Sequence, residues 1–71
     1  MVDVKSELTG SVWRILVSEG STVSAGDEIM VLESMKMEIP VVAPASGTVQ
    51  SLHVAEGDAV EAGSLLARVE P

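Results

Sequence analysis

Apolar residues recur along the chain in short runs that glycine-containing segments interrupt. The runs are rich in valine and isoleucine, and the interruptions read Glu-Gly and then Ala-Gly. β-branched residues favour strands, and glycine supplies the positive φ values that tight turns need. The glycine spacing leaves no window long enough for a helix. The pattern therefore predicts an all-β fold made of short strands.

The same pattern occurs twice, at an offset of 37 residues. Residues 10–34 read GSVWRILVSEGSTVSAGDEIMVLES, and residues 47–71 read GTVQSLHVAEGDAVEAGSLLARVEP. Nine of the 25 aligned positions are identical, and every glycine stays in register. Self-similarity at a fixed offset is the signature of a repeated structural unit. The chain is therefore predicted to consist of two similar halves.

Strict alternation of apolar and polar residues fails at one step in each copy. The step runs from Val12 to Ile15 in the first copy and from Val49 to Leu52 in the second. A three-residue step in a strand predicts a β-bulge at the same place in both halves. Halves of this size cannot bury their apolar faces alone, so we expect them to pack about a pseudo-twofold axis. The predicted fold is a flattened antiparallel β-barrel or sandwich of two four-stranded halves, forming one domain over residues 1–71.

The segment E-S-M-K-M-E-I-P, residues 33–40, joins the two copies. Strands are predicted at 29–33 and 38–42, with a two-residue hairpin turn centred on Met35 and Lys36 between them. Such turns need positive φ, which Met and Lys adopt at a cost of order 1–3 kcal/mol each. A chain that needed only a turn would use Asn-Gly, so the segment indicates function. Pseudo-symmetry places the chain ends at the equivalent seam, so we expect hairpin and termini at opposite ends.

Composition narrows the function further. The 71 residues carry eleven acidic and four basic side chains, a net charge of −7. This balance argues against nucleic acid and against an anionic membrane surface as partners. The N-terminal sequence does not resemble a signal peptide, and no apolar run approaches the roughly 20 residues that span a bilayer. The absence of cysteine fits a reducing compartment, so we expect a cytoplasmic protein.

The lysine and its two methionine neighbours are the candidate functional residues. A lysine is usually a solvated surface charge, and methionine usually fills a core. At a hairpin tip, however, Met35 and Met37 have no core to fill, so they are interpreted as a contact surface beside Lys36. The sequence has no phosphate-binding loop and no cluster of metal ligands. His53 stands alone and is interpreted as a plain surface or partly buried histidine, because catalysis or metal binding normally needs partners.

The hairpin and its surroundings resemble the biotinyl domain of biotin carboxyl carrier proteins. The resemblance rests on E-S-M-K-M-E, on Gly26-Asp27 before it and on A-P-A-S-G-T-V at 43–49 after it, and it spans essentially the whole chain. It is strongest to the free-standing, single-domain biotin/lipoyl attachment proteins. It implies that a separate biotin protein ligase attaches biotin covalently to Lys36. Ligase and carboxylase recognition would use the residues around the lysine: Glu33, Ser34, Met35, Met37 and Glu38.

The resemblance implies a carrier that is not itself an enzyme. A biotin carboxylase would carboxylate the attached biotin, and a carboxyltransferase would pass the carboxyl group to an acyl-CoA or a keto acid. The isolated carrier is expected to be monomeric. Two departures from the family stand out: Ser34 replaces a commoner alanine, interpreted as a change of little consequence, and the thumb loop of some bacterial carriers is missing.

Two other functions stay open. Lipoyl domains usually have D-K-A at this turn, so M-K-M favours biotin over lipoate, but a lipoyl or dual carrier remains an alternative. The other alternative is an unmodified β interaction module that kept the fold and lost the role. The mass of the protein after expression with each ligase and cofactor would separate the three.

Overall fold

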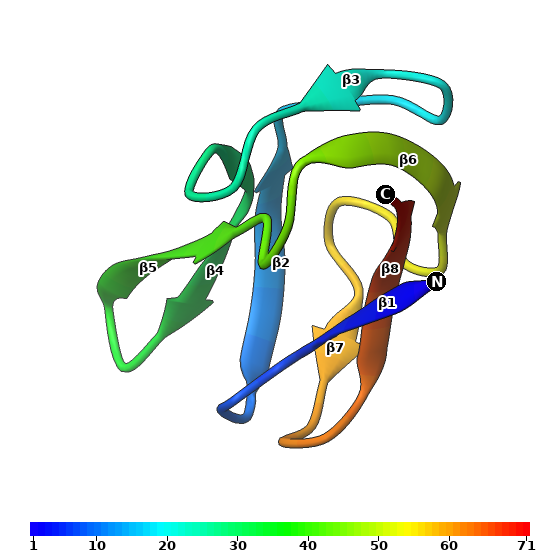
Figure 1. Cartoon of the computed structure of the whole chain (residues 1–71). Coiled ribbons are helices and arrows are strands. Elements are labelled where there is room, and N and C mark those ends of the chain that lie inside the picture. Colours follow the sequence, from blue (N-terminus) through cyan, green and yellow to red (C-terminus); the bar gives the residue numbers. More distant parts are fainter.

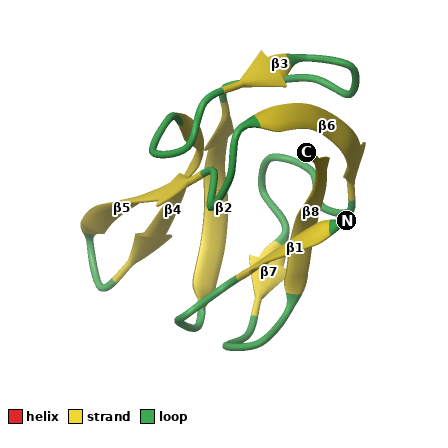
Figure 2. Cartoon of the chain, viewed as in Figure 1, coloured by secondary structure: helices red, strands yellow, loops and turns green.

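A computed structural model describes all 71 residues and consists entirely of strands and loops (Figures 1 and 2). No helix is present that could cross a membrane. The eight strands are β1 (Val2–Lys5), β2 (Gly10–Ile15), β3 (Thr22–Val23), β4 (Glu28–Ser34), β5 (Met37–Val42), β6 (Gly47–Leu52), β7 (Ala59–Val60) and β8 (Leu65–Glu70).

The strands form two four-stranded antiparallel sheets. Sheet A has the order β1-β8-β6-β3, and sheet B has the order β5-β4-β2-β7. The molecule is elongated, with extents of 32 × 17 × 17 Å. This arrangement confirms the predicted all-β flattened sandwich. Adding 37 to the residue numbers of β2, β3 and β4 gives those of β6, β7 and β8, except that β8 ends one residue early, so the two sheets are pseudo-twofold mates.

The two halves of the sequence do not each form one sheet. Each sheet takes two strands from each half, because β3 pairs with β6 in sheet A and β7 pairs with β2 in sheet B. Two backbone hydrogen bonds related by the 37-residue offset join the halves at these places. Val12 N donates to Asp58 O, and Val49 N donates to Ser21 O, both at 2.8 Å. The halves are therefore interlocked, which the repeat alone did not predict.

Both predicted bulges are present. The register shifts between Val12 and Arg14 where β2 meets β4, and between Val49 and Ser51 where β6 meets β8. A bulge bends the strand and leaves one residue outside the regular pairing. The bulge in β2 leaves Trp13 as the residue without a cross-strand partner in β4.

A repeated glutamate satisfies a backbone amide just after each bulge. The Ile15 amide donates to the Glu56 carboxylate, and the Leu52 amide donates to the Glu19 carboxylate, both at 3.0 Å. Each bond spans the two halves of the chain. The Glu-Gly pair that marks both copies of the repeat therefore has a structural role beyond its turn.

The core between the sheets is aliphatic. Twelve buried apolar residues form one cluster, and the largest fully buried ones come from β2, β4, β6 and β8. Val23 and Val60 insert into it from the short strands β3 and β7. The one buried polar side chain, Ser6, is satisfied because its hydroxyl donates to the Leu8 carbonyl at 2.6 Å. The core therefore leaves no buried side-chain polar atom without a partner.

The chain ends and the β4–β5 hairpin lie on opposite sides of the molecule. In Figure 1 the N- and C-termini lie together near β1 and β8, while the β4–β5 turn projects at the other side. This confirms the placement predicted from the repeat.

Candidate functional site

The hairpin between β4 and β5 has the predicted two-residue turn. Met35 and Lys36 have φ values of 53° and 64°, and they are the only non-glycine residues with positive φ. Ser34 pairs with Met37 directly below them. Two positive φ values in succession define the turn type that matches the twist of a hairpin. The strands extend one residue further toward the turn than predicted, to Ser34 and from Met37.

The tip is fully open to solvent. Met35 is 92% exposed and Met37 is 64% exposed, and Lys36 between them is also exposed. The one ion pair of the structure, between Arg68 and Asp3, lies in sheet A and leaves the Lys36 amine without a carboxylate partner. The hairpin therefore presents an accessible primary amine between two exposed thioether side chains.

Ser34 fastens the base of the turn to the body of the domain. Its hydroxyl donates to the Thr9 carbonyl at 3.0 Å. Gly10 permits this approach, because a Cβ at that position would overlap the Glu33 carbonyl oxygen. The serine thus makes a contact that alanine could not make, while the expectation that the change is of little consequence stays a prediction. No sequence pattern pointed to a contact between residues 25 apart.

Two carboxylates flank the turn on the same pair of strands. Glu33 and Glu38 lie directly opposite each other in the β4–β5 register, and both are exposed. Like charges opposite each other in a sheet are slightly destabilising, so stability does not explain the pair. The pair places two negative charges on the strands next to the turn that carries Lys36. All six sequence-predicted site residues therefore meet at one tip.

The other chemical candidates lie elsewhere. His53 is exposed just after β6, as expected for a surface histidine, and its Nε2 lies 2.8 Å from the Ser51 hydroxyl. The structure brings no group of three His, Cys, Asp or Glu residues together in an arrangement that could hold a metal ion.

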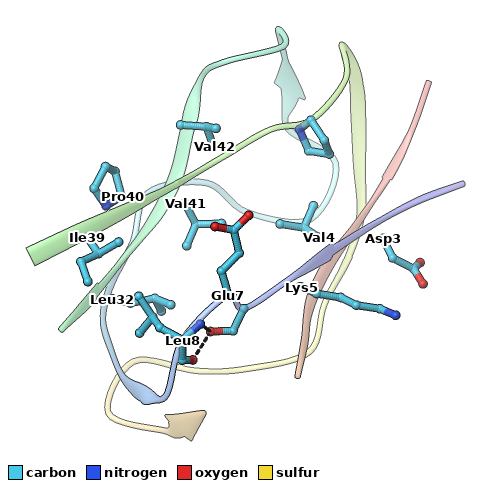
Figure 3. Close-up of a pocket in the computed structure, with 12 residues that line it drawn as sticks. Asp3, Val4, Lys5, Glu7, Leu8, Leu32, Ile39, Pro40, Val41 and Val42 are labelled. Carbon is cyan, nitrogen blue, oxygen red and sulfur yellow. Dashed lines mark hydrogen bonds between the residues drawn. The ribbon is translucent and has the colours of Figure 1, made fainter. Parts of the chain in front are cut away.

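A groove of about 480 Å³ runs between the edge strands of the two sheets. Most of its lining comes from β1, the loop that follows β1, and residues 39–42 of β5, with Leu32 of β4 and Pro44, and Figure 3 shows Glu7 lying across it. The groove does not include the turn. The tip itself is therefore a projection, which suits a residue that another protein must reach.

Comparison with known proteins agrees with this geometry. The family described as "Biotin-requiring enzyme" matches residues 2–69. The biotinylated protein TB7.3 homolog of Mycobacterium leprae is 48% identical over 65 residues, which are 92% of either chain. The biotin/lipoyl attachment protein of Bacillus subtilis is 43% identical over 63 residues, covering 89% of this chain and 86% of that protein. The chain therefore belongs to the family of biotin- and lipoyl-attachment domains.

A solved structure with the same fold comes from a much larger enzyme. The crystal structure of the urea carboxylase of Kluyveromyces lactis superposes with a TM-score of 0.92 and 39% identity. The match covers 97% of this chain but 6% of that enzyme. The fold described above is thus also found as a small part of a carboxylase.

The tip fits the chemistry of covalent biotin attachment. An amide to the biotin carboxyl group needs a primary amine that a second protein can reach. Lys36 offers one on a turn whose two strands pair without a break from Met30 and Val41 to the turn. The other lysine, Lys5, ends edge strand β1 beside the groove. Of the two lysines, only Lys36 occupies a projecting tip.

Proposed function

We propose that this protein is a non-catalytic biotin carrier that a biotin protein ligase modifies on Lys36. The observation that carries the proposal is the turn, because Met35 and Lys36 keep a backbone conformation unfavourable for both while their side chains remain exposed. Strain that persists at an exposed site is typical of functional segments. The family assignment supports biotin as the group that is attached.

The modification forms one amide bond. The deprotonated Lys36 Nζ attacks the carboxyl carbon of a biotin acyl adenylate, the C–N bond forms, and AMP leaves with the bonding electrons of the C–O bond. The ligase supplies the activated acyl group and accepts the proton that the amine loses. The carrier supplies position, because a turn on paired strands holds the amine within a narrow range of directions.

We propose that the modified carrier serves a biotin-dependent carboxylase. When bound, biotin supplies a ureido nitrogen that accepts and releases a carboxyl group. The chain itself presents Lys36 beyond the body of the domain, with Met35 and Met37 as apolar contacts for the enzymes it meets. Support comes from the superposition on the urea carboxylase of Kluyveromyces lactis and from the biotin carboxyl carrier protein of Streptococcus mutans, which is 44% identical over 59 residues.

Intact mass measures the modification directly. After coexpression with a biotin protein ligase and biotin, we expect the protein to gain the mass of one biotinyl group. Lys36→Arg should abolish the gain, and Lys5→Arg should leave it unchanged. Labelling that persists in Lys36→Arg would refute the proposed site.

The same measurement tests the second candidate function, attachment of lipoate. This candidate is supported by the name of the Bacillus subtilis relative, a biotin/lipoyl attachment protein. Coexpression with a lipoate ligase and lipoate should leave the mass unchanged if the carrier is specific for biotin. If the mass stays unchanged in both the biotin and the lipoate experiment, the result would favour an unmodified interaction module. Capture of the biotinylated protein, followed by identification of co-purifying carboxylase subunits, would then name its partners.

A further inference from the structure

The outer face of sheet B carries an unusual set of apolar side chains. Alternation places the core residues of β2, β4 and β5 on the inner face and their neighbours on the outer face. Figure 3 shows this on β5, where Pro40 and Val42 project to the side opposite Ile39 and Val41. The outer residues that are apolar form what we call the sheet B patch: Trp13, Leu16, Val31, Pro40 and Val42.

The patch is accessible to a partner. Trp13 is 44% exposed, Leu16 is 47% exposed and Val42 is 45% exposed. The Arg14 guanidinium lies 5.1 Å from the centre of the Trp13 ring, an arrangement that steadies the ring against the outer surface. Scattered exposed apolar residues are normal, but a contiguous group on one face marks an interaction site.

The pseudo-twofold supplies an internal comparison for the patch. The equivalent outer face of sheet A has the same strand order, and each patch residue has a mate 37 positions away. The five mates are all polar: Gln50, His53, Arg68, Asp3 and Lys5. Since both faces have the same backbone framework, the framework does not account for apolar residues on one of them alone. The difference indicates that sheet B has a partner there.

The patch is continuous with the hairpin. Strands β4 and β5 run through the patch and directly into the turn, and Val31 pairs with Pro40 three residues below Ser34. At about 3.3 Å per residue, this pair lies about 10 Å along the sheet from the base of the turn. A protein that grips the tip therefore overlaps the patch, whereas sheet A contributes no strand to the hairpin.

Three carboxylates border the patch, against the single Arg14 guanidinium over the Trp13 ring, so the net charge that a partner meets there is negative. Glu33 and Glu38 lie at the end nearest the turn, and Glu28 pairs with Val42 at the other end. A second copy of this chain would bring two acidic borders together, which is unfavourable. The complementary partner has an apolar centre and a basic rim.

We propose that the sheet B patch is the docking surface for the biotin protein ligase, an inference that rests on the proposed function. The ligase must bring its active site to the bare amine, so its body lies against the domain, whereas later enzymes meet the biotin at the end of a longer arm. The turn and Met37 offer three exposed side chains, whereas specific protein interfaces bury at least roughly 600 Å² on each side. The adjoining patch supplies the remaining contact area.

Exchange of patch residues for their own mates tests the proposal. The variant carrying Trp13→Gln and Val42→Lys replaces two exposed residues with those that the same framework accepts in sheet A. The matched control is Gln50→Ala on the outer face of sheet A. Circular dichroism and thermal unfolding establish that the wild type, the double variant and the control are folded before ligase kinetics are measured.

We expect the double variant to raise the KM of the ligase for the unmodified carrier about tenfold or more, with kcat within twofold. Loss of one interface contact worth more than 1 kcal/mol is common at anchor residues, and 1.4 kcal/mol corresponds to tenfold. The control should change KM less than twofold. The Kd of the ligase for the unmodified carrier without ATP should rise in parallel. Glu28→Gln should raise KM at low salt and lose its effect at high salt.

An unchanged KM and Kd in the double variant, with wild-type protein still labelled on Lys36, would overturn the docking surface and leave the proposed function standing. A wild-type protein that gains no biotin would overturn both. Sedimentation of the carrier alone should show a monomer. A dimer that the double variant dissociates would assign the patch to self-association instead.

Discussion

The backbone strain of the turn can be tested by replacing Met35 with asparagine. A non-glycine residue in the left-handed region costs roughly 1–2 kcal/mol, and asparagine adopts that region more readily than methionine. The Met35 side chain is 92% exposed, so its removal gives up almost no buried surface. We therefore expect Met35→Asn to raise the free energy of unfolding by about 1 kcal/mol. For a domain of this size, that gain corresponds to an increase in Tm of about 4–8 °C.

Urea and thermal unfolding followed by circular dichroism measure this change, and Met37→Asn is the matched control. Met37 is also an exposed methionine, but it lies in β5 and lacks a positive φ. Asparagine is unfavourable in strands, so the free energy of unfolding of the control should fall by a few tenths of a kcal/mol. The reasoning would be refuted if Met35→Asn were no more stable than the wild type or than the control.

The functional half of the prediction uses the same variant. If Met35 is kept for recognition, Met35→Asn should be labelled with biotin more slowly although it is more stable. A more stable protein labelled at the wild-type rate would show that the Met35 side chain has no role in recognition.

Three further predictions concern the framework that holds the turn. Glu56→Ala and Glu19→Ala should each lower the free energy of unfolding by about 1 kcal/mol, because each removes the acceptor of one backbone amide, and urea unfolding should show additive losses in the double variant. Gly47→Ala should lower the free energy of unfolding by about 3 kcal/mol or prevent folding, because the new Cβ would overlap the Glu70 carbonyl. Thermal unfolding measures this loss. Ser34→Ala should speed hydrogen exchange of the hairpin amides about threefold or more while Tm falls by a few degrees at most; unchanged exchange would contradict the tether.

The repeat made much of the fold predictable. The 37-residue offset places both bulges, and it places the hairpin opposite the termini, because a pseudo-twofold relates the two seams. The turn at Met35 and Lys36 was predictable because the predicted strands leave only the four residues 34–37 between them, a link short enough for a two-residue hairpin turn. These conclusions depend on local periodicity and on internal symmetry, both of which a single sequence contains.

The interlock and the contacts around the site were not predictable in the same way. Exchange of β3 and β7 between the sheets depends on long-range pairing, and two-residue strands give no periodic signal of their own. The hydrogen bond from Ser34 to Thr9 joins neighbours in space that no motif links. The outer patch of sheet B becomes visible only when the structure shows which side of each strand faces solvent.

The position of the lysine within the pseudo-symmetry has a consequence for connectivity. The framework has two equivalent ends, one closed by the β4–β5 connection and the other formed by the chain termini. The covalent linkage between the two interlocked halves is therefore the same segment that displays Lys36.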